Sequence, residues 1–78
     1  MNINLKFMQS VFKKALGIKN YNLKIDSKYE KVPNWDSLGH MKIISEIEKR
    51  LRIEFEIDEI IGKNTVKKLI DMTTKKFK

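Results

Sequence analysis

The stretch that begins at Asp36 constrains the fold most, because a helix-capping residue there precedes an amphipathic pattern. An aspartate side chain accepts a hydrogen bond from a first-turn amide, so Asp36 is expected to be an N-cap. The residues that follow place an apolar stripe on the inward side of a helix, with His40 at its N-terminal end. The stripe consists of Ile43, Ile44, Ile47 and Leu51. We therefore expect a helix from Ser37 to near Leu51 or Arg52.

Two further amphipathic segments flank this helix. In the first, from about Asn4 to Leu16, the apolar residues that share one side are Leu5, Met8, Phe12, Ala15 and Leu16. Gly17 is expected to end this helix, since glycine readily adopts the left-handed conformation found at helix C-termini. The last helix is expected to be capped by Asn64 or Thr65. Its inward residues are predicted to be Val66, Leu69, Ile70, Thr73 and Phe77.

The longest connection, residues 17–35, shows no sustained helical period but contains spaced apolar residues. These residues are Ile18, Tyr21, Leu23, Ile25, Tyr29 and Val32. Because loops of this length are uncommon in compact domains and are often functional, we expect a loop pinned across the core. Pro33 disfavours a helical conformation at the residue before it and ends the loop.

Residues 53–58 alternate between apolar and acidic side chains, as a short strand does, but the sequence offers no second strand to pair with them. They are therefore predicted to form a connecting loop. Asp58 is expected to cap a single-turn helix that runs through Ile61 and is ended by Gly62. The predicted fold class is all-α: a small four-helix bundle of three main helices, one short helix and a long first loop, forming a single domain over residues 1–78.

The composition of the chain limits how this small fold can be stabilised and where in the cell it is expected. The chain has 78 residues and no cysteine, so disulfides and thiolate metal sites cannot support its small core. The sequence contains no apolar run close to the roughly 20 residues that cross a bilayer, and residues 1–6 lack the organisation of a signal peptide. The acidic residues also lack the alternating ligands of a calcium loop. We expect a soluble cytoplasmic protein without a metal site.

The net charge of +7 is unevenly distributed along the chain. Residues 1–36 carry seven lysines and three acidic residues, and residues 65–78 carry five lysines and one acidic residue. Residues 37–64 carry five basic and six acidic residues, so the central helix lies in the least basic part. A cationic surface assists encounters with acidic partners but does not identify them.

Ser37 directly follows the expected cap and therefore stands at the start of the central helix. A helix N-terminus presents unpaired amides and the positive end of the helix dipole, which together stabilise a phosphate. Ser37 has His40 three residues further on, but no third group that would orient a catalytic pair. We interpret Ser37 as a passive hydroxyl that receives a phosphate-linked group, and we expect no catalytic residue.

The chain resembles acyl carrier proteins and the related peptidyl carrier domains over about residues 32–72. The matching residues are Trp35-Asp36-Ser37-Leu38-Gly39-His40-Met41, Ile44, Ile47-Glu48, Ile53-Glu54-Phe55, Asp58-Glu59-Ile60, Asn64-Thr65-Val66 and Leu69-Ile70. The resemblance implies that a phosphopantetheinyl transferase uses coenzyme A and magnesium to attach 4'-phosphopantetheine to Ser37. The terminal thiol of that arm would hold an acyl or aminoacyl group as a thioester and deliver it to partner enzymes.

The resemblance also implies a docking surface beside Ser37. Its predicted residues are Asp36, Leu38, Met41, Lys42 and Lys49. Carriers of general fatty-acid synthesis are usually strongly acidic on the second helix, whereas this helix carries lysines there and has Gly39 at a position that is often acidic. These departures from the common pattern suit a carrier of a specialised pathway, and the resemblance implies a monomer. Its partners would be a loading enzyme (a ligase or an adenylating enzyme) and an acceptor acyltransferase or synthase.

Two other functions remain compatible with the sequence. A small basic nucleic-acid-binding protein would need its basic residues gathered on one recognition face, but the chain has only two arginines and its central helix mixes charges. A docking module with the carrier fold could also exist without modification at Ser37. For the residues near Ser37 we expect structural roles: Trp35 packs at the loop–helix junction, and His40 is buried or half-buried and bonded to loop backbone.

Overall fold

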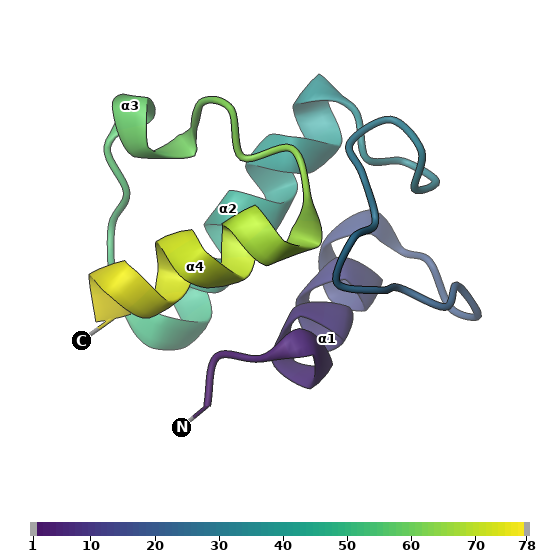
Figure 1. The fold of residues 1–78 in the computed structure, drawn as a ribbon, viewed down its shortest axis with the longest axis horizontal. Coiled ribbons are helices and arrows are strands. Elements are labelled where there is room, and N and C mark those ends of the chain that lie inside the picture. The colour runs from purple at the N-terminus through teal and green to yellow at the C-terminus, as the bar shows by residue number, and fades with distance from the viewer. Residues whose placement is uncertain (1, 78) are drawn as a thin grey trace.

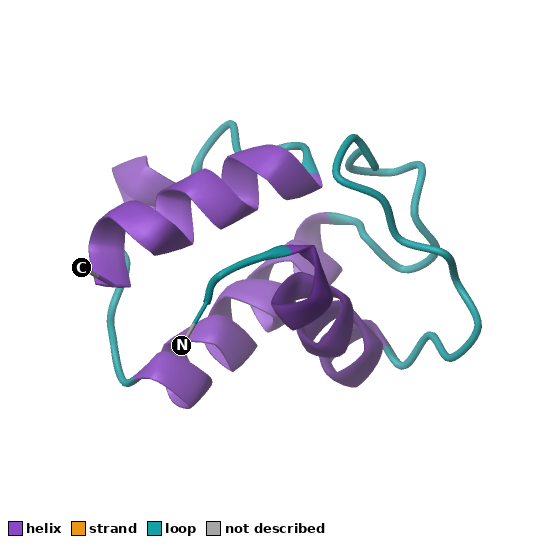
Figure 2. Cartoon of the chain, turned by 60° about the horizontal axis from the view of Figure 1, so that its bottom comes forward, coloured by secondary structure: helices purple, strands orange, loops and turns teal. Residues whose placement is uncertain are grey.

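The computed structural model describes residues 2–77, which form four helices (Figure 1). These are α1 (Leu5–Leu16), α2 (Ser37–Leu51), α3 (Ile57–Ile60) and α4 (Val66–Phe77). Within the described range the backbone forms no strand, only one isolated antiparallel bridge between Lys28 and Thr65. Figure 2 shows the same arrangement from another side, with α1 and α2 below α4. The predicted all-α fold with three main helices and one short helix is confirmed.

The ends of α1 follow the sequence prediction. The Asn4 side chain accepts a hydrogen bond of 3.0 Å from the Phe7 amide, so Asn4 is the N-cap just outside the helix. Gly17 closes α1 in the left-handed conformation with φ of 67°, and its amide donates to the Lys13 carbonyl. A glycine adopts this conformation without the steric cost that a Cβ would add.

The short helix α3 begins earlier than the sequence analysis predicted. Its N-cap is Glu56 rather than Asp58, and it ends at Ile60, because Ile61 has an extended backbone. Glu56 and Glu59 form a reciprocal capping box, in which the Glu56 amide donates to the Glu59 carboxylate at 2.7 Å. Asp58 instead lies inside the helix, where an acidic residue near the positive end of the dipole is favourable.

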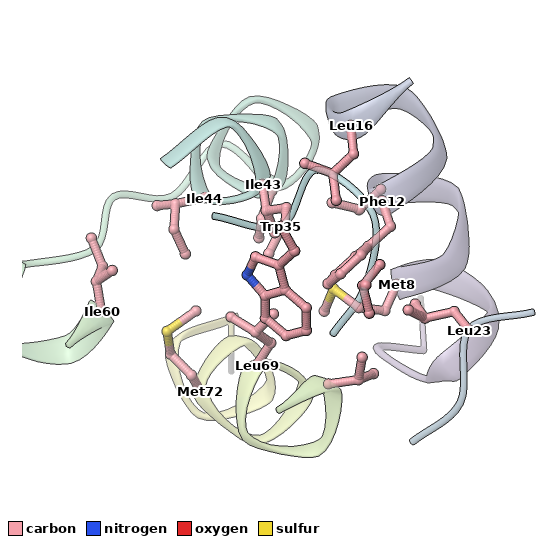
Figure 3. Packing of buried hydrophobic residues seen from close by; sticks show 14 of the residues in the cluster. Met8, Phe12, Leu16, Leu23, Trp35, Ile43, Ile44, Ile60, Leu69 and Met72 are labelled. Carbon is pink, nitrogen blue, oxygen red and sulfur yellow. The ribbon is translucent and has the colours of Figure 1, made fainter. Parts of the chain in front are cut away.

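Trp35 lies at the centre of the core, between α1, α2 and α4 (Figure 3). Its ring and that of Phe12 pack edge to face with a centroid separation of 4.8 Å, which fixes the end of the long loop against α1. The expected inward stripe of α2 is buried: Ile43, Ile44, Ile47 and Leu51. In α4 the buried residues are Val66, Leu69, Met72 and Thr73, so the prediction missed Met72, and Phe77 is 38% exposed instead of inward.

The long loop is pinned to the start of α4. The Val66 amide donates to the Ser27 carbonyl at 3.0 Å, and the Lys67 amide donates to the Ile25 carbonyl at 2.9 Å. Such first-turn amides have no partner inside their own helix, so the loop supplies it. The Thr65 hydroxyl caps α4 through the Lys68 amide, which selects Thr65 from the two predicted caps. The loop is therefore held across the bundle, as the sequence analysis expected.

Candidate functional site

The site begins with the cap of α2. Asp36 accepts a hydrogen bond of 2.8 Å from the Gly39 amide, as predicted, and Ser37 is the first residue of the helix. Ser37 is exposed, and no acidic side chain occupies the first turn of α2. Its hydroxyl thus stands beside first-turn amides and the positive end of the helix dipole, next to the Asp36 carboxylate that caps the helix.

Gly39 allows the preceding loop to approach α2 very closely. A Cβ at this buried position would lie 1.9 Å from the Asn34 carbonyl oxygen, so no other residue fits without movement of the backbone. Asn34 itself has a positive φ of 66°, and its side-chain amide donates to the Leu16 carbonyl at 3.0 Å. These contacts fix the turn that leads into Ser37. From the sequence, Gly39 was part of the matching motif and stood at a position that is often acidic, but no structural role was predicted for it.

His40 is half-buried and contacts two parts of the structure. The Trp35 indole nitrogen donates to its Nδ1 at 3.0 Å, and the two rings are nearly parallel, with an interplanar angle of 12°. The ring also lies near the backbone of Ile60, the last residue of α3, which acts on its pKa. The hydrogen-bond partner of the His40 ring is therefore the Trp35 side chain, and not the loop backbone that the sequence predicted.

Burial determines the charge of His40. Desolvation lowers the pKa of this imidazole below its ordinary value of 6.5, and the backbone of Ile60 opposes that effect only in part. The imidazole is thus neutral near pH 7, which leaves Nδ1 able to accept the indole hydrogen bond. Because its ring nitrogen is engaged with Trp35, His40 fits a structural role better than that of a base for Ser37.

The side chain that does reach Ser37 is Tyr29, from the long loop. The two hydroxyl oxygens lie 3.1 Å apart, within hydrogen-bond distance. From the sequence, Tyr29 was expected only to be one of the spaced apolar residues that pin the loop. Its closeness to Ser37 depends on the path of residues 30–36, so local sequence patterns carry no signal for it.

A cavity of about 350 Å³ opens beside Ser37. One side consists of Tyr29 with the first turns of α2, and the other consists of the end of α3 and the chain that follows it. The lining residues are Tyr29, Ser37, His40, Met41, Ile60, Ile61, Gly62, Lys63 and Asn64. A flexible arm attached to the Ser37 oxygen has both solvent and an adjacent, mainly apolar hollow available to it. The residues present therefore fit a phosphate-linked group.

Four of the five predicted docking residues line a second hollow, of about 390 Å³, along the outer side of α2. The exposed fractions are 67% for Leu38 and 45% for Met41, and Lys42 and Lys49 lie further along the same face. Asp36 is also exposed but stands at the start of the helix, outside this hollow. We call the surface formed by Leu38, Met41, Lys42 and Lys49 the α2 face.

The acidic side chains of α2 take part in contacts that hold the fold. Glu46 pairs with Arg50 at 2.7 Å, and Arg50 also donates to the Ser10 hydroxyl of α1 at 2.8 Å. Glu48 accepts the Phe55 amide at 2.9 Å and so secures the connection to α3. Because these carboxylates are engaged, the exposed charges of the α2 face are its two lysines.

Residues 2–77 contain neither a membrane-spanning helix nor a cluster of metal-binding side chains. None of the helices in this range is long and apolar enough to cross a membrane. The same residues contain no group of three or more histidine, cysteine, aspartate or glutamate side chains placed to hold a metal ion.

The comparisons with known proteins agree with this geometry. Residues 7–73 match the phosphopantetheine attachment site family. The fold is similar to the solution NMR structure of the holo acyl carrier protein from Geobacter metallireducens, with a TM-score of 0.81 and 26% sequence identity. That likeness covers 92% of this chain and 83% of the other. A search of curated proteins found no significant match. The chain therefore belongs to the phosphopantetheine attachment family: it is a carrier protein of the kind to which 4'-phosphopantetheine is covalently attached, and not an enzyme.

Proposed function

We propose that Ser37 is the attachment point of 4'-phosphopantetheine and that the chain carries acyl or aminoacyl groups in a specialised biosynthetic pathway. One observation supports the site above all: Ser37 is an exposed hydroxyl at the first position of α2, beside an open cavity. The attached arm supplies a thiol that holds cargo as a thioester. The chain itself positions the arm, stabilises its phosphate and presents the surfaces that partner enzymes recognise.

Attachment requires a hydroxyl that another enzyme can reach. In the transfer, the Ser37 oxygen forms a bond to the β-phosphorus of coenzyme A, the bond to the leaving 3',5'-ADP breaks, and the serine proton passes to a base of the transferase. The resulting phosphodiester lies at the N-terminus of α2, where the helix dipole favours an anion by about 0.3–1 kcal/mol. Asp36 already accepts from Gly39 within its own cap, and its exposed carboxylate is proposed to contact the transferase or its magnesium ion.

The α2 face is proposed to dock the enzymes that use the carrier. Leu38 and Met41 offer exposed apolar contact close to Ser37, and Lys42 and Lys49 offer positive charge along the same hollow. Charge complementarity then calls for acidic groups on the loading ligase or adenylating enzyme and on the acceptor acyltransferase or synthase. We infer a monomer that works in the cytoplasm, and the absence of cysteine from the sequence fits a reducing compartment.

The proposal is tested by intact mass after incubation with coenzyme A, magnesium and a promiscuous phosphopantetheinyl transferase. Wild type is expected to gain one phosphopantetheine, and Ser37→Ala is expected to gain none. Ser45→Ala is the matched control, because Ser45 is also an exposed serine of α2. A second carrier of known competence in the same tube shows that the transferase is active. An unmodified wild type beside a modified second carrier contradicts the proposal and favours an unmodified docking module.

A further inference from the structure

Tyr29 is held in place independently of Ser37. Its amide donates to the Asn64 carbonyl at 2.9 Å, and the neighbouring Lys28 pairs with Thr65 in the isolated antiparallel bridge. These bonds attach the loop to the connection between α3 and α4. The backbone from which the phenol extends is therefore fixed by contacts that do not involve α2.

Aromatic contacts fix the direction of the Tyr29 ring. It meets Trp35 edge-on with a centroid separation of 6.1 Å, and it meets His40 edge-on at 6.0 Å. Both partners are themselves joined by the hydrogen bond from Trp35 to His40. A phenylalanine would make the same ring contacts, so the packing alone gives no reason for a hydroxyl at this position.

The hydroxyl makes the one contact that phenylalanine would lose. It lies 3.1 Å from the Ser37 oxygen, at the edge of the cavity that Tyr29 and Ser37 line together. Before modification either hydroxyl can donate the hydrogen bond to the other. After modification the serine oxygen carries no hydrogen, so the phenol becomes the donor. A hydrogen bond to a charged phosphate oxygen is stronger than one between two neutral hydroxyls.

We propose that Tyr29 is a positioning residue for the attachment site. Its hydroxyl orients the Ser37 oxygen before transfer, and afterwards it donates to the phosphodiester, so that the arm starts along the shared cavity. This inference rests on the proposed attachment at Ser37. It assigns Tyr29 no part in bond making, because the phenol only hydrogen-bonds to the Ser37 oxygen that reacts.

The test compares wild type with Tyr29→Phe, which keeps the ring and removes only the hydroxyl. Tyr21→Phe is the matched control, because Tyr21 lies in the same loop but lines a different cavity, against α1. Loss of one hydrogen bond is expected to slow transfer to Tyr29→Phe by roughly threefold to tenfold in kcat/KM. Tyr21→Phe is expected to match wild type, and both variants are expected to keep the wild-type melting temperature.

Phosphorus NMR of the modified proteins provides a readout that ring packing alone does not change. The phosphodiester resonance of Tyr29→Phe is expected to shift from the wild-type position, and that of Tyr21→Phe is expected to stay. In the modified wild type, nuclear Overhauser contacts are expected between the Tyr29 ring protons and the arm methylene next to the phosphate; this measurement needs no variant. Equal transfer rates with an unmoved phosphorus resonance, or absence of those contacts, would overturn the role of Tyr29. Failure of wild type to accept the arm would instead refute the attachment site.

Discussion

Gly39 shows how one residue determines the approach to the attachment serine. A Cβ there would meet the Asn34 carbonyl oxygen at 1.9 Å, so Gly39→Ala forces the loop and α2 apart. We expect a loss of about 1–3 kcal/mol in the free energy of unfolding, as for other overpacked sites. Urea denaturation measures this loss, and Ser45→Ala on the exposed side of the same helix is expected to stay within about 0.5 kcal/mol of wild type. A Gly39→Ala variant as stable as wild type would show that the loop relaxes freely.

His40 predicts how stability depends on pH. Burial lowers its pKa below 6.5 in the folded chain, so on acidification the unfolded chain takes up a proton first. The stability that neutral His40 contributes is complete above pH 6.5 and is lost as the pH falls through the folded pKa. His40→Asn keeps an acceptor near the Trp35 indole but does not titrate. From about pH 7.5 to about pH 5.5, unfolding free energies are expected to fall more steeply for wild type than for His40→Asn. Parallel curves would contradict this assignment.

At the start of α2, Asp36 is both the N-cap of the helix and a proposed contact of the transferase. Removal of the cap in Asp36→Ala is expected to cost about 0.5–2 kcal/mol, whereas Asp36→Asn keeps an acceptor for the Gly39 amide and most of the stability. If the carboxylate also contacts the transferase or its magnesium, Asp36→Asn accepts the arm more slowly although it is folded like wild type. Denaturation and transfer kinetics on both variants separate these two roles. An Asp36→Asn protein with the wild-type transfer rate would limit Asp36 to capping.

The same elements show which features the sequence could predict. The approximate bounds of α1 and α2 and the caps at Gly17 and Asp36 were predicted, because capping and amphipathic spacing depend on neighbouring residues. The start of α3 was assigned to Asp58 because several acidic residues in that stretch can cap a helix, and only the reciprocal bonding of Glu56 with Glu59 selects Glu56.

The position of Ser37 at an exposed helix start was likewise predictable from its local sequence, and the structure confirms that position. Its surroundings were not predictable. Tyr29 reaches Ser37 only through the path of the loop between them, and the Gly39 contact requires the positive φ of Asn34. Both features arise from packing between segments, which helical periodicity does not report.

For the whole molecule, the distribution of charge is the feature most relevant to partner choice. The net charge of +7 leaves the α2 face cationic because Glu46 and Glu48 are engaged within the fold. Attraction between exposed charges weakens as salt screens them, so a docking contact through this face should depend on ionic strength.

The double variant Lys42→Glu/Lys49→Glu tests this surface with the loading ligase or adenylating enzyme from the source organism. We expect a drop of about tenfold in kcat/KM at low salt, with a smaller difference at high salt. Lys13→Glu/Lys14→Glu makes the same change of charge on exposed positions of α1 and is expected to have a much weaker effect. Equal effects of the two double variants would indicate that net charge, and not the α2 face, governs the encounter.

The most direct measurement of the central claim locates the arm on the chain. After enzymatic transfer to wild type, proteolysis and tandem mass spectrometry are expected to find phosphopantetheine on the peptide that contains Ser37, linked to that residue. The chain has three other serines, Ser10, Ser27 and Ser45, which serve as internal alternatives. Attachment to any of these, or a chain that stays unmodified while a competent carrier is loaded beside it, would contradict the account.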